Sequence, residues 1–519
     1  MNEKEFRAFG KATVDYVADY NENLRDRPVL PSVTPGYLYE FLPAEAPEQP
    51  ESWQQILQDV EQHIMPGVTH WNSPRFHAYY PTANSYPAIV GEMLSAGIGC
   101  LGVSWIASPA CTELETIAMD WLAQLLGLPQ EFLNSSPGPG GGVIQGSASE
   151  STLAALFAAR ESTVERLKKE GPDLDEVTIR SKLVTYTSDQ SNSSVEKGGR
   201  LSAMPMRLLP ADKRCSLRGA TLLEQVKKDL QAGLIPCCLV ATLGTTATCA
   251  FDNLDELGPI CKKYKIWLHV DAAYAGAAFV CPEYRHWMSG IEYVDSFNVN
   301  CHKWLLVNAD CSALWVRNDK EFTSAFNVNQ VYLENDSEEV RDYRHWQVPL
   351  GRRFRALKLW FVMRLYGVEG LQKHIRHTVY LAKMFENLVN RDGRFEIPVE
   401  VNMGLICFKL KGPDTLTKQL LDRLMERKKI YVIPGAYAGK TLVRFVVCSR
   451  FSTERDIQFA WTEISSVSTK ILQSKSRTNP QPTLTIREFE IPNTKQKSVD
   501  MFARLMNFKM GIEKQTLCS

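Results

Sequence analysis

The stretch Asn298-Val-Asn-Cys-His-Lys-Trp304 decides the fold that we expect from this sequence. Its lysine, Lys303, comes just after a short run, 296–299, that has the pattern of a strand. Asp271 ends a second apolar run, 266–270, which also predicts a buried strand. Either charged residue alone is typical of a protein surface. An amine and a carboxylate at the ends of neighbouring strands, flanked by small and aromatic residues, instead predict a functional site at one edge of an α/β sheet.

This pair of side chains suits one cofactor, pyridoxal phosphate. A lysine ε-amine can bond to the aldehyde of that cofactor. An aspartate can pair with its pyridine nitrogen and keep the nitrogen protonated, so that the ring takes up electrons from a breaking bond. We therefore predict that Lys303 and Asp271 hold pyridoxal phosphate.

Composition narrows the class of protein. A chain of 519 residues predicts two or three domains rather than one core. Its 59 basic and 59 acidic residues cancel, so no basic field favours nucleic acid or an anionic membrane. The charged start lacks the apolar centre of a signal peptide, and no apolar run approaches the length of a membrane span. The thirteen cysteines are scattered and never spaced Cys-x-x-Cys, which favours reduced thiols, a cytoplasmic protein and no metal site.

The order of patterns along the chain predicts an α/β architecture with a mainly parallel sheet. The strand-like runs are 183–186, 237–242, 266–270, 297–299 and 313–316, separated by helical or loop segments such as 217–231. We expect four parts: an N-terminal arm (1–85), a large cofactor-binding domain (86–360), a smaller C-terminal α/β domain (361–475) and a linker with a tail (476–519). Strand-like runs at 401–410 and 441–448 belong to the smaller domain.

A glycine-rich segment, 138–149, precedes a helical pattern that begins at Glu150. Glycines and small hydroxyls before a helix can bring backbone N–H groups to a phosphate, although a plain tight turn has the same composition. The segment is not a phosphate loop of the Walker type, because Gly146 is followed by Ser147 and not by lysine. It also lacks the Gly-x-Gly-x-x-Gly spacing, which disfavours a nicotinamide oxidoreductase.

Two further segments have open interpretations. The run 70–82 is so dense in aromatic residues that it forms either a core corner or a pocket for an aromatic substrate. The long polar segment 324–355 is typical of a lid, and its Tyr332 is either a surface anchor or a group that closes over the substrate.

The blocks His302-Lys303-Trp304 and Asp271-Ala-Ala-Tyr274 resemble the group II pyridoxal-phosphate decarboxylases, specifically the aromatic L-amino acid decarboxylases, over about residues 6–473. The resemblance implies the aspartate-aminotransferase-like fold (fold type I), a homodimer and an aromatic L-amino acid substrate. It assigns cofactor binding to Ala148, Ser149, Thr246, Asp271, Ala273, Asn300, His302 and Lys303, with Gly351 reaching the phosphate across the dimer.

The resemblance also implies the residues that meet the substrate: Trp71, Tyr79, Tyr80, Pro81 and Thr82, with Leu101 and Val103 supplied by the other subunit. It makes Tyr332 a mobile catalytic residue that protonates the substrate carbon after carbon dioxide leaves. Two positions depart from the decarboxylases of catechol and indole substrates, which usually carry phenylalanine where this chain has Tyr80 and Val103.

One position decides the expected reaction. Asn192 stands where the decarboxylases have a histidine over the cofactor ring, and none of the nine histidines lies between His77 and His269. An imidazole exchanges a proton near neutral pH and an amide does not, although asparagine is also a tolerated polar replacement. Asparagine here is the mark of the insect aromatic aldehyde synthases. We therefore expect dioxygen to intercept the substrate carbon, so that L-dopa yields 3,4-dihydroxyphenylacetaldehyde, carbon dioxide, ammonia and hydrogen peroxide.

Two alternatives remain beside this reaction. A plain decarboxylase would convert L-dopa to dopamine. A non-catalytic protein that kept the fold is disfavoured, because Lys303, Asp271 and Ser149 are all present.

Overall fold

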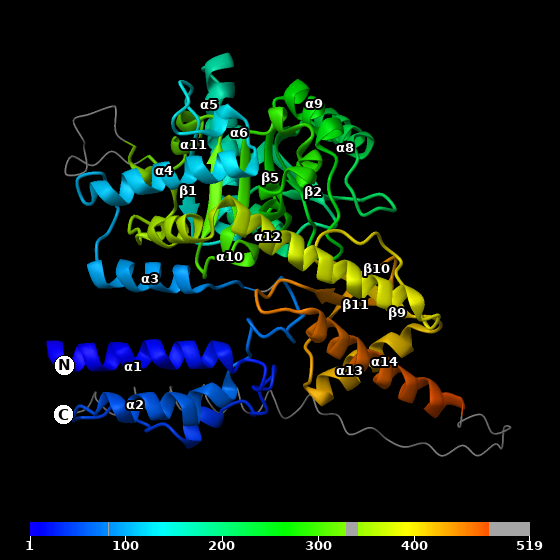
Figure 1. Ribbon diagram of the computed structural model, residues 1–519. Helices are drawn as coiled ribbons and strands as arrows, with labels where there is room; N and C mark the ends of the chain where they lie inside the picture. Colours follow the sequence, from blue (N-terminus) through cyan, green and yellow to red (C-terminus); the bar gives the residue numbers. More distant parts are fainter. Residues whose placement is uncertain (81, 328–340, 477–519) are drawn as a thin grey trace, which may run out of the picture. The chain divides into compact units, whose positions relative to one another are not determined.

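Seven strands form the large sheet of the protein, in a computed structural model that describes residues 1–80, 82–327 and 341–476 (Figure 1). They are β1 (Gly141–Gln145), β2 (Leu183–Ser188), β3 (Met206–Leu209), β4 (Ile235–Thr242), β5 (Trp267–Asp271), β6 (Ser296–Asn300) and β7 (Ser312–Val316). Their order across the sheet is β1-β7-β6-β5-β4-β2-β3. The pairs from β3 to β6 are parallel, and β7 is antiparallel to both β6 and β1. The predicted mainly parallel sheet is therefore confirmed.

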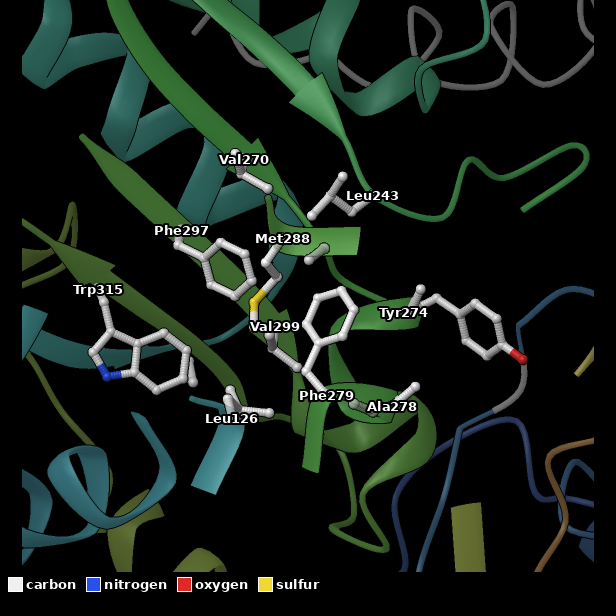
Figure 2. Close-up of a cluster of buried hydrophobic side chains, with 14 of the residues drawn as sticks. Leu126, Leu243, Val270, Tyr274, Ala278, Phe279, Met288, Phe297, Val299 and Trp315 are labelled. Atoms are coloured by element: carbon white, nitrogen blue, oxygen red, sulfur yellow. The ribbon is translucent and has the colours of Figure 1, made fainter. Parts of the chain in front are cut away.

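Helices cover both faces of this sheet, which explains why its strands are apolar on both sides. On one face, Phe297 and Val299 of β6 and Val270 of β5 pack with Phe279 and Met288 (Figure 2). On the other face, Val240 of β4, Trp267 of β5 and Leu314 of β7 pack with residues of α5 (Ala148–Glu170), α7 (Ser193–Leu201) and α11 (Asp319–Thr323). Successive side chains of a strand point to opposite faces, so one strand serves both cores.

The remaining helices of this part of the chain are α3 (Tyr86–Ile98), α4 (Pro109–Leu126), α6 (Glu176–Lys182), α8 (Gly219–Gln231), α9 (Leu254–Tyr264) and the short α10 (Cys301–Trp304). Helix α3 lies against α12 (Arg355–Arg391), where Gly91 lets the two backbones approach. A Cβ atom at Gly91 would come within 2.7 Å of the Lys358 Cα atom, so a side chain there would push the helices apart.

The structure corrects the interpretation of the glycine-rich segment. Its central part, 141–145, is the buried edge strand β1, and α5 begins at Ala148 rather than at Glu150. Glycine hides the alternating pattern of a strand because it has no side chain. It is required here since a Cβ atom at Gly142 would lie 2.6 Å from the Trp315 ring. Strand β3 (206–209) also lies outside the runs that predicted strands.

A smaller antiparallel sheet follows, in the order β10-β11-β9-β8. Its strands are β8 (Phe395–Glu396), β9 (Leu405–Leu410), β10 (Ile433–Tyr437) and β11 (Lys440–Val446), and its helices are α13 (Asp414–Arg427) and α14 (Glu454–Ser476). The predicted runs 401–410 and 441–448 contain β9 and most of β11. The expected boundary at residue 360 falls inside α12, which has a non-helical residue at Gly367. The division into domains stays a prediction.

The N-terminal part consists of α1 (Glu3–Glu22) and α2 (Trp53–Asp59), joined by a proline-rich connector that holds one short 3-10 helix, Tyr37–Glu40. The aromatic run that follows lies along the smaller sheet. The His77 N–H donates to the Tyr431 carbonyl at 2.8 Å, and the Val446 N–H donates to the His77 carbonyl at 3.0 Å. The aromatic run is thus hydrogen-bonded to the smaller sheet at His77, before the chain continues to the large sheet.

Within the described residues, no helix combines the length and the apolar content that a membrane crossing requires. In the same residues, no three His, Cys, Asp or Glu side chains are grouped as metal ligands would be.

Candidate active site

The predicted site residues come together because strands that run in one direction end at one edge of a sheet. Strands β2, β4, β5 and β6 are parallel, and β1 shares their direction because two antiparallel steps separate it from β6. Asn300 at the end of β6 and Gln145 at the end of β1 both pair with Ser312, so these ends lie level. We call this edge, where the strands reach their carboxyl ends, the carboxyl edge.

Lys303 and Asp271 are the charged centre of the carboxyl edge; Asp271 is buried and Lys303 is partly buried. Burial raises the pKa of the Asp271 carboxyl, and the positive charge of Lys303 opposes that rise. Burial likewise lowers the pKa of the Lys303 amine, opposed by Asp271. A lowered pKa increases the neutral fraction of the amine, which is the form that attacks an aldehyde. The Ala273 N–H donates to Asp271 Oδ1 at 3.0 Å and fixes the orientation of the carboxylate.

An aromatic wall lies beside Lys303. The ring of Tyr80 stacks on that of Tyr274 with 3.7 Å between centroids, and Tyr274 stacks on Trp304 at 4.7 Å. The Lys303 Nζ atom lies 5.8 Å from the centroid of the Tyr80 ring. The Tyr80 hydroxyl donates to the Thr245 carbonyl at 2.9 Å, which holds the ring in place. Tyr274 and Trp304 stand inside the two motif blocks of the sequence, but their stacking was not predicted.

Groups suited to a phosphate follow the ends of β1 and β4 at the same carboxyl edge. Ala148 and Ser149 begin α5, and the first N–H groups of a helix favour an anion. Ser149 and Thr246 have exposed side chains, so their hydroxyls are available as donors. The residues therefore fit a cofactor that carries an aldehyde, a pyridine nitrogen and a phosphate.

His302 is held neutral beside these groups. Burial, followed by the charge of Lys303, lowers the pKa of His302 to about 4. His302 Nδ1 lies 3.0 Å from the backbone nitrogen and 3.1 Å from the carbonyl oxygen of Cys311, so the backbone of Cys311 fixes the orientation of the ring. The His302 Nε2 atom lies 3.3 Å from the side-chain nitrogen of Asn300. The buried Asn300 Oδ1 atom has no hydrogen-bond partner within the described protein, so a turned amide would place this oxygen at His302 Nε2.

Asn192 also lies at this edge, after the end of β2. Its Nδ2 atom donates to the Thr246 hydroxyl at 2.9 Å. Its Oδ1 atom accepts from the Ser194 N–H at 3.0 Å and caps α7. The side chain is thus fixed at both ends of its amide, next to a predicted phosphate ligand.

The predicted substrate residues divide into two groups. Tyr80 and Thr82 lie at Lys303, since the Thr82 hydroxyl donates to the His302 carbonyl at 3.4 Å. Trp71 and Tyr79 instead stack on each other, with 5.4 Å between centroids, and the Tyr79 hydroxyl lies 3.0 Å from that of Tyr431. Both of these rings are partly exposed.

The residues expected to act from a second subunit form a separate group. Gly102, between Leu101 and Val103, donates its N–H to the Arg352 carbonyl at 3.1 Å, which places both residues next to Gly351. Leu101 is 57% exposed. Pro81 and Tyr332 lie outside the described residues.

Comparison with known proteins identifies the class that this site defines. Residues 35–411 match the family model described as the pyridoxal-dependent decarboxylase conserved domain. The chain is 54% identical to 3,4-dihydroxyphenylacetaldehyde synthase of Drosophila melanogaster, over 92% of this chain and 94% of that one. It is 53% identical to the aromatic-L-amino-acid decarboxylase of Mus musculus, over 92% of this chain and all of that one. A crystal structure of Oryza sativa TDC with PLP and tryptamine superposes with a TM-score of 0.87 at 39% identity, over 91% and 99% of the two chains.

The chain therefore belongs to the pyridoxal-dependent decarboxylases, in the branch that acts on aromatic amino acids. The aspartate-aminotransferase-like fold expected from the sequence is confirmed. The relatives include both an aldehyde synthase and amine-forming decarboxylases at nearly equal identity. Overall identity does not separate the two reactions, so the distinction depends on individual residues.

Proposed function

We propose that this enzyme converts L-dopa, dioxygen and water to 3,4-dihydroxyphenylacetaldehyde, carbon dioxide, ammonia and hydrogen peroxide. The observation that carries the proposal is the fixed amide of Asn192 at the carboxyl edge. The electron pair freed when carbon dioxide leaves reduces dioxygen to hydrogen peroxide. The carbon that bore the amine is oxidised, and water then releases ammonia and leaves the aldehyde.

In this proposal Lys303, Asp271 and the groups around them hold pyridoxal phosphate. When bound, the cofactor supplies an electron sink for the bond that breaks. Asp271 would pair with the pyridine nitrogen, Ala273 would pack against the ring, and Lys303 would supply the amine that bonds to the aldehyde. Ala148, Ser149, Thr246, Asn300 and His302 would hold the phosphate. His302 stays neutral near pH 7 and adds no charge to the site.

Asn192 diverts the reaction because of what an amide lacks. An imidazole at this place could carry a proton to the substrate carbon near neutral pH, whereas an amide has no proton to exchange there. The Thr246 hydroxyl and the Ser194 N–H both engage the Asn192 side chain, so it stays where such a relay would stand. Protonation of the carbon then depends on Tyr332 alone, and dioxygen competes with it.

The substrate pocket is built from aromatic residues. The Tyr80 ring lies beside Lys303 and is supported from behind by the buried Tyr274 and Trp304 rings, and Thr82 lies at the same place. Trp71, Tyr79 and Pro81 extend the pocket in this proposal. A flat aromatic side chain such as that of L-dopa fits such walls through stacking.

A homodimer completes the site in this proposal. Large hydrophobic side chains are exposed on α3 and in two nearby loops: Ile98, Leu101, Ile106, Val348 and Leu350. We call these five residues the apolar surface. Leu101, Val103 and Gly351 lie within or next to it, and from there they reach the partner's site. An exposed apolar area of this kind marks a protein interface. Twelve described cysteines are free, which supports a reducing, cytoplasmic location.

The test is turnover of L-dopa with and without oxygen, with hydrogen peroxide, carbon dioxide and dopamine measured together. We expect peroxide to match carbon dioxide in air, with little dopamine. The variant Asn192→His should shift the product towards dopamine. Asn192→Ser is the matched control, because serine keeps the cap of α7 without an imidazole and should still give aldehyde. Dopamine equal to carbon dioxide in both atmospheres would contradict the proposal.

The second candidate is decarboxylation of L-dopa to dopamine. The capping bond of Asn192 favours it, because asparagine is a better helix cap than histidine and could stand here for that reason alone. In that case Asn192→Ser and the unchanged enzyme would both form dopamine without peroxide.

A further inference from the structure

Two cysteine thiols lie in contact at the start of α4, next to the segment that holds Leu101 and Val103. The Sγ atoms of Cys100 and Cys111 are 3.4 Å apart. Cys100 follows Gly99, the residue that ends α3 in a left-handed conformation, and Cys111 is in the first turn of α4. The fold thus brings together two thiols that are separated by a complete loop.

The two thiols differ in their access to water. Cys100 is partly exposed, whereas Cys111 is 5% exposed. Burial raises the pKa of the Cys111 thiol to about 12, so Cys111 stays protonated. A small oxidant therefore meets Cys100 first, and Cys111 is placed as the thiol that resolves the product.

We propose that Cys100 and Cys111 are an oxidation site that hydrogen peroxide converts to a disulfide. In the first step the Cys100 sulfur attacks one oxygen of peroxide, the O–O bond breaks, and a sulfenic acid and water form. In the second step the Cys111 sulfur attacks the Cys100 sulfur, the Cys111 thiol proton passes to the departing hydroxyl, and a disulfide and a second water form. The two thiols lose two electrons, and one peroxide gains them.

The disulfide would act on the loop between the two residues. A disulfide bond is about 2.0 Å long, so the sulfur atoms must close by about 1.4 Å from their 3.4 Å separation. The loop is packed near them, because a Cβ atom at Gly102 would already lie 3.1 Å from the Cys111 Cβ atom. Gly102 also donates to the Arg352 carbonyl, so a shift here moves Leu101 and Val103 relative to Gly351.

The enzyme itself would produce the oxidant, so the role of this site rests on the proposed function. Aldehyde synthesis would release one hydrogen peroxide in every turnover. The two thiols, beside the loop that holds Leu101 and Val103, would then be oxidised as peroxide accumulates, and the disulfide would slow turnover. The other cysteines are less suited, as Cys281, for example, is fully buried and has a backbone carbonyl 3.8 Å from its sulfur.

The experiment uses the reduced full-length holoenzyme. It is treated with increasing amounts of hydrogen peroxide, blocked with an alkylating reagent and mapped by mass spectrometry without reduction. We expect a cross-linked peptide that joins Cys100 to Cys111 and the loss of two alkylated thiols per chain, reversed by dithiothreitol. In Cys111→Ser, a dimedone probe should trap the sulfenic acid on Cys100. Cys281→Ser is the matched control and should cross-link as the unchanged enzyme does.

The effect on activity is measured in the same samples. We expect kcat/KM for L-dopa to fall by about tenfold in the oxidised enzyme, since displacements near 1 Å of substrate-positioning groups cost this much or more. Cys100→Ser should keep its activity in peroxide. Absence of the Cys100–Cys111 peptide, or a disulfide that joins Cys518 instead, would overturn the proposal.

A second arm separates this inference from the proposed function. The enzyme turns over L-dopa in air with no added peroxide, with and without catalase. A cross-link that catalase prevents supports both proposals. A cross-link with added peroxide but none during turnover supports the disulfide site and counts against peroxide as a product.

Discussion

The carboxyl edge buries ionisable groups, whereas the apolar surface exposes hydrophobic ones. At the carboxyl edge, burial shifts the pKa values of Lys303, Asp271 and His302. On the apolar surface, the same chain leaves Leu101 and Ile106 exposed, at 57% and 72%. Burying a charge and exposing a large hydrophobic side chain both cost free energy. The first cost is typical of a catalytic site, and the second is the observation behind the homodimer that we propose.

Arg352 connects the two regions. Its guanidinium pairs with the buried Glu115, which also accepts the Ile144 N–H of β1 at 2.7 Å. Its backbone carbonyl accepts the Gly102 N–H from the loop of the apolar surface. Arg352 therefore holds the loop around Gly102, which we expect to reach the partner, in a fixed position relative to the sheet.

The largest expected effect concerns the charged centre of the carboxyl edge. Lys303→Ala should lower kcat for L-dopa by about 10⁴-fold or more, because the amine that bonds to the cofactor aldehyde is lost. The measurement is carbon dioxide release at saturating L-dopa, with borohydride trapping of the cofactor on the unchanged enzyme. Lys265→Ala, at an exposed lysine, is the control and should keep full activity. Turnover by Lys303→Ala near the normal rate would remove Lys303 from the site.

The next largest effect is expected from loss of the Arg352–Glu115 ion pair. Arg352→Met should lower the free energy of unfolding by about 3–5 kcal/mol, because it leaves the buried Glu115 carboxylate without its cation. Urea unfolding followed by circular dichroism measures the loss. Arg7→Met breaks an exposed ion pair with Glu3 and should change stability by less than about 1 kcal/mol. Equal losses in the two variants would show that burial of the Arg352 pair has no special weight.

A smaller effect is expected on the apolar surface itself. The double variant Leu101→Asp and Ile106→Asp should weaken dimerisation by about 100-fold, or about 2.7 kcal/mol, since an interface would bury the new charges. Sedimentation velocity over a range of concentrations measures the change. Val177→Asp, at a residue of α6 that is 73% exposed, is the control. A dimer unaffected by both changes would place the interface elsewhere.

The smallest effect is a dependence of stability on pH at His77, which is buried and stacks on Phe445 of β11. Burial lowers the pKa of His77 to about 4. Between pH 6.5 and about 4 the unfolded chain binds a proton on this histidine and the folded chain does not. Stability therefore falls by about 1.4 kcal/mol per pH unit as the pH is lowered through this window, and the term vanishes above it.

His77→Gln should remove that contribution. Between pH 6 and pH 5 the free energy of unfolding of the variant should fall less steeply, because its unfolded chain binds about one proton fewer than that of the unchanged protein. The measurement is urea unfolding at several pH values. His286→Gln alters an exposed histidine and should leave the slope unchanged. An unchanged slope in His77→Gln would mean that His77 is protonated in the folded protein.

The amino-acid sequence by itself determined five of the seven strands of the large sheet, β2 and β4 to β7, and the charges at their ends. Apolar runs such as 237–242 and 266–270 are local signals, and parallel strands end at one edge, so Lys303 and Asp271 had to lie close together. The same local signals failed at 141–145, because glycines carry no side chains to show the alternation of β1.

Only the tertiary structure decided which distant side chains meet. The stack of Tyr80, Tyr274 and Trp304, the Arg352–Glu115 pair and the contact between Cys100 and Cys111 join residues from different elements. No spacing in the sequence predicts them, because they depend on how strands and helices pack rather than on the period of any one element. The sequence specified the chemical groups of this enzyme, and packing gave each group its neighbours.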